Sequence, residues 1–253
     1  MFVDYTISTL RRLLSESYNI QTIDAPQLAR TSWMAKTSLL IIPGGRATPY
    51  AQGLAGLANG NIIDYVKNGG SYLGFCAGSY FASDKVEFEI GNPIMEVNAK
   101  RPLGFFPGTC KGAAFSGFDY ASEAGARAVK VTSVHTDMTY PIYWNGGGAF
   151  IDADKYDNID VLARYQDIPG TSNNVAAVLA RYGKGRALLS AVHAEYVPSQ
   201  PNSKLYNEIH PMQSEIDKLV RIWLGLLKLD LRQTPQPVPH LSANRNGRRI
   251  STA

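Results

Sequence analysis

The sequence predicts an α/β domain with a doubly wound, mostly parallel sheet and an antiparallel insertion. Short apolar runs end in turn signals, and the segments between them can form helices. Between about residues 85 and 148, Gly, Pro and aromatic residues crowd together, which indicates loops and antiparallel strands. We expect one compact domain over residues 1–230, followed by a flexible, basic, Pro-rich tail over 231–253.

Helices are expected near both ends of the domain. Apolar residues recur at helical spacing over Tyr5–Glu16, and a second apolar stripe follows Pro211 as far as Leu227. Between them, Gly183-Lys184-Gly185 predicts a hairpin turn. The runs predicted to be strands are Asn19–Ile23, Leu39–Ile42, Tyr72–Phe75, Lys130–Ser133, Pro141–Trp144, Val161–Tyr165, Ala176–Tyr182 and Arg186–Ser190.

Composition narrows the choice of partners. The formal charge is +4, and the segment 231–253 carries four arginines and no acidic residue, so the body has 21 basic and 21 acidic residues. A neutral body does not predict nucleic-acid binding. Because the chain lacks a long apolar run and a signal-peptide pattern, we expect a cytoplasmic protein with no membrane partner. Two cysteines, Cys76 and Cys110, predict reduced thiols and no metal site.

The segment Gly74-Phe75-Cys76-Ala77-Gly78 has the features of a nucleophile elbow. Such a turn lifts a nucleophile above the end of a buried strand and needs small neighbours. Here Tyr72–Phe75 is the strand and Ala77–Ser83 the helix, whose first turn favours a thiolate at Cys76. The alternative is that Cys76 is a small buried residue in a Gly-rich bend.

A thiol nucleophile needs a base, and His193 is the best placed of the four histidines. It follows the strand Arg186–Ser190, so it can meet Cys76 at the edge of the sheet where parallel strands end. Glu195 can accept from the other ring nitrogen and fix the tautomer. Alternatively, His193 caps a strand end and Glu195 is solvated.

A third element, Pro43-Gly44-Gly45, follows the strand expected beside the elbow. The N–H groups of Gly44 and Gly45, with that of Ala77, can form an oxyanion hole. The alternative is an ordinary turn between a strand and a helix. Cys110 has no nearby histidine in the sequence and is expected to be structural.

Taken in chain order, these motifs resemble class I glutamine amidotransferase-like domains, which have a flavodoxin-like sheet and a Cys, His and Glu triad. Further blocks resemble the N-terminal region of fungal biotin–protein ligases. The resemblance implies that Cys76, His193 and Glu195 form the triad, with Gly44, Gly45 and Ala77 near the oxyanion. The further blocks are Trp33–Thr37, Gly91–Val97, Phe105–Thr109, Glu123–Val129 and Tyr143–Gly148.

The chain departs from these families at several points. Tyr80 stands where glutamine-hydrolysing members often carry Gln, and Ala194 stands in the middle of a His-Pro-Glu pattern. The ligase catalytic domain is absent, so we expect no biotin ligase activity from this chain alone. The family fold opens with a central strand, whereas here the helix begins almost at Met1. We therefore expect an N-terminally incomplete domain whose first strand is missing.

Two functions of different classes remain. The first is thiol-dependent amide or acyl hydrolysis or transfer on a small-molecule substrate, with no metal and no organic cofactor. The second is a non-catalytic regulatory or ligand-binding module that keeps the elbow and binds a small ligand or a biotin ligase catalytic domain. A biotin-binding role rests on family association alone.

Overall fold

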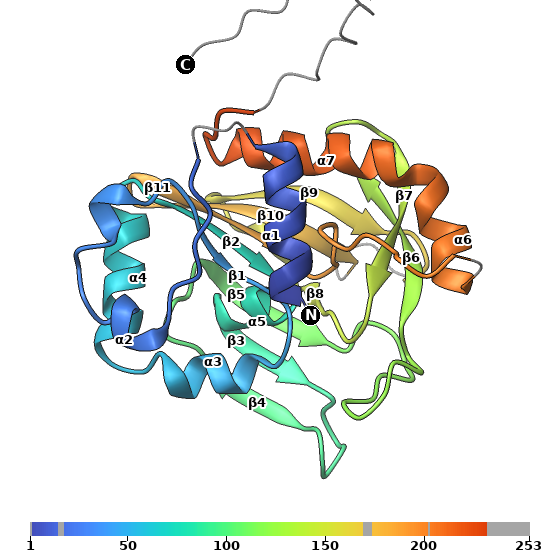
Figure 1. Ribbon diagram of the computed structural model, residues 1–253. Helices are drawn as coiled ribbons and strands as arrows, with labels where there is room; N and C mark the ends of the chain where they lie inside the picture. The colour runs from blue at the N-terminus through green and yellow to red at the C-terminus, as the bar shows by residue number, and fades with distance from the viewer. Residues whose placement is uncertain (1, 15–17, 169–173, 202, 232–253) are drawn as a thin grey trace, which may run out of the picture.

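The computed structural model describes residues 2–14, 18–168, 174–201 and 203–231, which form two sheets with helices packed around them (Figure 1). The larger sheet has seven strands in the order β1-β2-β11-β10-β9-β6-β7, and the smaller has four in the order β4-β3-β5-β8. The strands of the larger sheet are β1 Leu40–Ile42, β2 Ser71–Phe75, β6 Arg127–Ser133, β7 Thr139–Trp144, β9 Ile159–Tyr165, β10 Val175–Tyr182 and β11 Gly185–Ser190. Those of the smaller are β3 Ser83–Phe88, β4 Val97–Lys100, β5 Phe106–Gly112 and β8 Ala149–Phe150.

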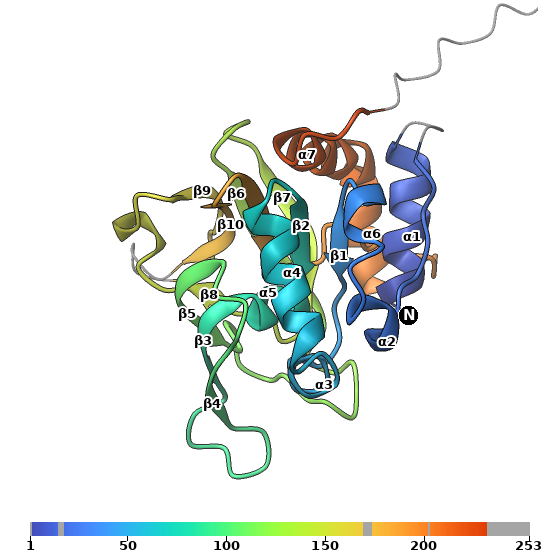
Figure 2. The ribbon, with the colours of Figure 1, turned by 90° about the vertical axis from the view of Figure 1, so that its left-hand side faces the viewer.

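Helices flank the larger sheet. Figure 2 shows α1 and α6 to one side of β1, α4 and α5 to the other, and α7 above them. The α-helices are α1 Phe2–Leu13, α2 Ala25–Leu28, α3 Ala47–Gly53, α4 Leu57–Lys67, α5 Ala77–Phe81, α6 Lys204–Ile209 and α7 Gln213–Leu226. Short 3₁₀ turns lie at Met34–Lys36, Ala153–Lys155 and His210–Met212. None of the described helices is both long and apolar enough to cross a membrane.

The α/β class is confirmed, but the parallel part of the sheet is limited to β1, β2 and β11. Strand β2 pairs in parallel with both of its neighbours, and the other four pairings of the larger sheet are antiparallel. Tyr182 pairs with Gly185, so the predicted hairpin reverses the chain from β10 into β11 over two residues. The antiparallel region is therefore larger than the predicted insertion, and the site lies in the parallel part.

Apolar periodicity explains how the helices at the two ends of the domain pack. In α7 the predicted stripe is buried, with Ile216, Leu219 and Trp223 each at most 1% exposed. Helix α1 buries Leu10 and Leu13 in the same core. A helix is stabilised mainly by burying such a stripe. The burial of their apolar residues in the core therefore holds α1 and α7 in place.

Two sequence predictions need correction. Asn19–Ile23 is not a strand: it forms no ladder with any described strand, and an apolar run becomes a strand only through pairing. The predicted helix from Pro211 begins instead as a 3₁₀ turn, and α7 starts at Gln213. Leu231, within the predicted tail, still pairs with Leu14, and residues 232–253 lie outside the described ranges.

Candidate functional site

Cys76 lies at the sharp turn between β2 and α5. Its backbone angles are φ 44° and ψ −99°, on the positive-φ side that side chains other than glycine rarely adopt. Its N–H donates to the carbonyl oxygen of Ser190 at 2.7 Å, which ties the turn to the end of β11. The predicted elbow is present, although α5 ends at Phe81 rather than Ser83, because Ser83 begins β3.

The two elbow glycines allow α5 to pack directly on the sheet. A Cβ atom on Gly78 would lie 2.0 Å from the carbonyl oxygen of Ile42, and one on Gly74 would lie 2.6 Å from the carbonyl carbon of Gly78. Neither space admits a methyl group, since real Cβ atoms are not found this close to backbone atoms. The close packing inferred from the sequence at these two positions is therefore present.

His193 lies close to both of its predicted partners. Its Nδ1 atom lies 2.8 Å from Oε1 of Glu195, and its ring lies next to Cys76, which raises the pKa of the ring. His193 and Glu195 are each 1% exposed. The backbone is held as well, since the N–H of His193 donates to Tyr143 and the Thr9 hydroxyl donates to the carbonyl oxygen of Glu195.

The charges around His193 favour its protonated form. Burial lowers its pKa, but the Glu195 carboxylate and the Cys76 sulfur raise it more, and the pKa settles at about 10. An imidazole with two such acceptors behaves as an imidazolium at neutral pH. Glu195 and His193 thus form a buried, charged pair beside Cys76.

Three further groups fix the imidazole ring in place. Phe2 stacks on its face with ring centroids 4.1 Å apart and planes at 22°, and Tyr143 meets it edge-on at 5.5 Å. On another side, a Cβ atom added to Gly44 would lie 2.2 Å from Cε1 of His193. The roles of Phe2 and Tyr143 were missed in the sequence, because no local pattern links either residue to His193.

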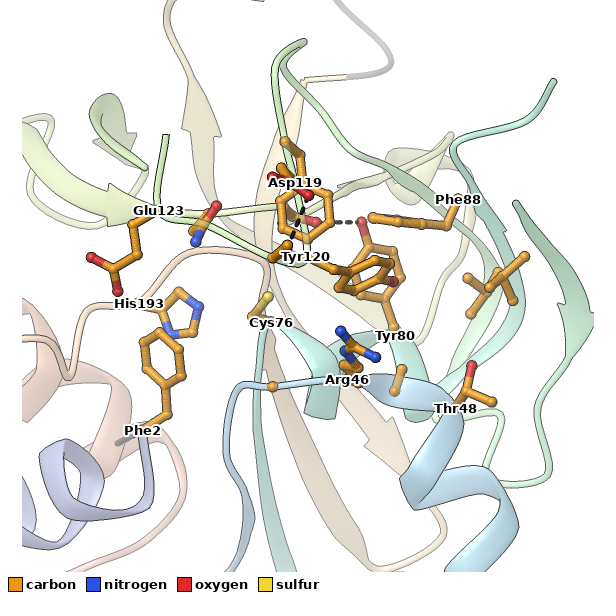
Figure 3. Close-up of a pocket in the computed structure, with 18 of the residues that line it drawn as sticks. Phe2, Arg46, Thr48, Cys76, Tyr80, Phe88, Asp119, Tyr120, Glu123 and His193 are labelled. Carbon is orange, nitrogen blue, oxygen red and sulfur yellow. Dashed lines mark hydrogen bonds between the residues drawn. The ribbon is translucent and has the colours of Figure 1, made fainter. Parts of the chain in front are cut away.

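A cavity of about 500 Å³ opens beside Cys76 (Figure 3). Of the six predicted site residues, Cys76, His193 and Gly45 line it, whereas Glu195, Gly44 and Ala77 do not. Gly44 and Ala77 are buried and Gly45 is exposed, so the two N–H groups that follow Pro43 face different surroundings. In the described ranges, no group of three or more His, Cys, Asp or Glu side chains is placed to hold a metal ion.

The remaining walls are aromatic with a few charged groups. Tyr80, Phe88, Phe118 and Tyr120 line one part of the cavity, and the buried Tyr80 hydroxyl donates to the carbonyl oxygen of Gly146 at 3.0 Å. The charged side chains are Arg46, Arg101, Asp119 and Glu123. Only Tyr80 among all these had been singled out from the sequence, as a departure from a family pattern.

Cys110 differs from Cys76 in its surroundings, since it does not line the cavity. It is a fully buried free thiol, and burial raises its pKa far above the ordinary range. Its nearest polar partners are Ser79 and Ser83 rather than a histidine. A thiol that stays protonated is a poor nucleophile, which fits the structural role expected for Cys110.

Residues 2–245 match the family model described as "Biotin-protein ligase, N terminal". The chain belongs to this family. It is 39% identical to the biotin–protein ligase of Schizosaccharomyces pombe over 198 residues, which make up 76% of this chain and 31% of that protein. An uncharacterized protein of Chlamydia muridarum is 38% identical over 179 residues, 70% of this chain and 68% of that one. Family members therefore occur in a fungus and in a bacterium.

The chain spans only 31% of the length of the yeast ligase, so the match covers one part of that enzyme. Among solved structures, a glutamine amidotransferase superposes with a TM-score of 0.52 at 17% sequence identity, over 85% of this chain and 93% of that one. At this identity the similarity concerns the fold alone. It confirms the glutamine amidotransferase-like fold that the elbow motifs implied.

Proposed function

We propose that the cavity beside Cys76 is an active site that transfers the acyl group of an amide or a related carbonyl compound to water or to another acceptor. One observation carries the proposal: His193 lines the cavity together with Cys76 while its Nδ1 lies 2.8 Å from the Glu195 carboxylate. A nucleophile, a base and a group that orients the base are the three parts of thiol catalysis. Here Cys76 and His193 reach the cavity and Glu195 is buried behind them.

The proposed reaction has two steps. The Cys76 sulfur attacks the carbonyl carbon, and as the bond to the leaving group breaks, imidazolium His193 gives its proton to the departing nitrogen or oxygen. A thioester on Cys76 results. Neutral His193 then takes a proton from water or another acyl acceptor as that molecule attacks the thioester. The acyl product leaves, and Cys76 and imidazolium His193 are restored. Glu195 holds the ring and stabilises its positive charge.

The N–H groups of Gly45 and Ala77 are the proposed donors to the oxyanion. Gly45 lines the cavity beside Cys76, and Ala77 is the residue after the nucleophile, where such a donor is required. Gly44 has a different proposed role. Because it packs against Cε1 of His193, its lack of a side chain lets the ring reach the sulfur.

The first test is the alkylation of Cys76 by iodoacetamide as a function of pH, located by peptide mass mapping. We expect the alkylation of Cys76 at neutral pH to be at least about tenfold slower in His193→Ala than in the unmodified chain. Cys110→Ala is the matched control and should alkylate like the unmodified chain. A pH profile centred near ~8.5 and unchanged by His193→Ala would refute the proposal.

A second candidate is a non-catalytic module that binds a small ligand next to a ligase catalytic domain. The buried Tyr80, which fills space beside the nucleophile, and the match to part of a biotin–protein ligase favour it. Reactive Cys76 without turnover of any amide, ester or thioester would support this function over catalysis. Titration calorimetry with a separately produced ligase catalytic domain tests the partner: measurable heat supports it and its absence excludes it.

A further inference from the structure

Two cations line the cavity without an acidic partner. Neither Arg46 nor Arg101 forms a salt bridge within the described ranges. Arg46 lies over the ring of Tyr120, 4.5 Å from its centroid. Arg101 is half-buried, and its Nε atom is inaccessible to solvent and has no hydrogen-bond partner in the part of the chain that the structure describes. A buried charged donor without a partner costs free energy. An acceptor on a bound ligand would therefore be stabilised at this position.

The acidic residues of the cavity do not supply that acceptor. The Asp119 carboxylate already accepts from the N–H of Ala121 and from the hydroxyl of Ser122. Glu123 lies on the His193 side of the cavity, whereas Arg46 lies on the side of Tyr80 and Thr48 (Figure 3). The carboxylate of Glu123 is therefore separated from the guanidinium of Arg46.

Aromatic side chains form another part of the cavity wall. Tyr80 and Phe88 meet edge to face with centroids 5.6 Å apart, and Phe118 packs on Phe88 at 5.5 Å. Such walls bind the body of an organic ligand, and a few charged groups orient it. A volume of about 500 Å³ is in the range that small organic ligands occupy.

We infer that the cavity takes an organic acid, whose carboxylate or phosphate is bound by Arg46 and Arg101 while its apolar body packs on Tyr80 and Phe88. The inference deepens the proposed function, since it makes the substrate an acyl compound with an anionic group remote from the carbonyl that Cys76 attacks. Arg101 contributes more than Arg46, because it is half-buried and Arg46 is exposed to screening solvent.

The test separates binding from thiol chemistry by using the full chain carrying Cys76→Ser. The probes are 3-phenylpropionate and its neutral amide, 3-phenylpropionamide, which match in shape and differ in charge. Isothermal titration calorimetry should show the acid binding about tenfold more tightly than the amide. A separate titration with phenyl phosphate distinguishes a preference for phosphate from one for carboxylate, and both agree with the inference.

Substitutions then assign the preference to the two cations. Arg101→Gln should remove most of the preference for the acid and Arg46→Gln a smaller part, whereas Arg101→Lys should keep most of it. Arg30→Gln, at an exposed arginine away from the cavity, should leave it unchanged. Equal affinity for acid and amide, no measurable binding of the acid, or a preference that survives in the double Gln variant would each overturn the inference. None of these results depends on whether Cys76 is reactive.

Discussion

The two sides of the cavity are built differently. On one side, His193 is 1% exposed and is held by ring contacts, hydrogen bonds and a glycine with no room for a side chain. On the other, Arg46 is exposed and Arg101 is only half-buried and unpaired. The first side has its geometry fixed before any ligand arrives, whereas the second gains its hydrogen bonds only from a ligand. Substitutions on the His193 side should therefore mainly change stability, and those on the arginine side should mainly change ligand binding.

Among the substitutions, the largest expected loss of stability is that of Gly44→Ala. The added Cβ would lie 2.2 Å from Cε1 of His193, so the ring must move, and overpacking of this kind costs about 2–3 kcal/mol. Urea unfolding measures the change. In the matched control Gly60→Ala, within α4, nothing lies within 4 Å of the new methyl group, and stability should rise by up to about 1 kcal/mol. An equal response of the two variants would refute the tight packing around His193.

A pH-dependent change in stability is expected from the titration of His193. Its pKa in the folded state, about 10, is above the unfolded value of 6.5. The stability that protonation contributes is thus fully present below pH 6.5 and is lost as the pH rises through about 10. The thermal midpoint of unfolding of the unmodified chain should fall as the pH rises between these two values. In His193→Gln this part of the fall should be missing.

The next expected effect is that of Phe2→Leu, which keeps an apolar side chain but removes the ring stacked on His193. The loss of a stacked pair is worth about 1 kcal/mol, and it should appear in urea unfolding. The alkylation rate of Cys76 should fall together with stability, because the ring of His193 loses one of its supports. Val3→Ala, at a 43% exposed neighbour, is the control and should change neither quantity measurably.

The smallest expected change in stability is that of Arg101→Met. The substitution keeps most of the aliphatic stem and removes a guanidinium whose Nε is buried without a partner. Stability should stay the same or rise by up to about 1 kcal/mol. A clear loss of stability in urea unfolding would contradict the contrast between the two sides of the cavity, because it would mean that Arg101 serves the fold rather than a ligand.

The sequence allowed prediction of those parts of the site that depend on local order. Gly74, Cys76 and Gly78 lie within one turn, and His193 with Glu195 follows a strand that ends at the same edge, so chain order was enough to bring them together. Phe2, Tyr143 and Arg101 come from a helix, an antiparallel strand and the end of a strand of the second sheet. No periodicity in one segment indicates which side chain of a distant segment it will meet.

Prediction of the fold from the sequence was limited in the same way. The helix at the N-terminus and the strands at Leu40–Ile42 and Ser71–Phe75 agree with predictions made from local apolar patterns. Asn19–Ile23 has a similar pattern but is not a strand, because ladder hydrogen bonds come from a neighbour rather than from the segment itself. Strand direction was also beyond local reasoning: the short hairpin at Gly183 could be recognised, but the antiparallel pairings of β9 and β6 connect distant residues.

The stacking of Phe2 on His193 also has a spectroscopic consequence. An aromatic ring whose face lies 4.1 Å from an imidazole places the carbon-bound protons of that imidazole in its shielding cone. The proton resonances of His193 should therefore lie upfield of those of an ordinary histidine and move downfield whenever the first turn of α1 leaves the ring. A one-dimensional magnetic resonance spectrum can thus follow the docking of the N-terminal helix onto the site, without any label.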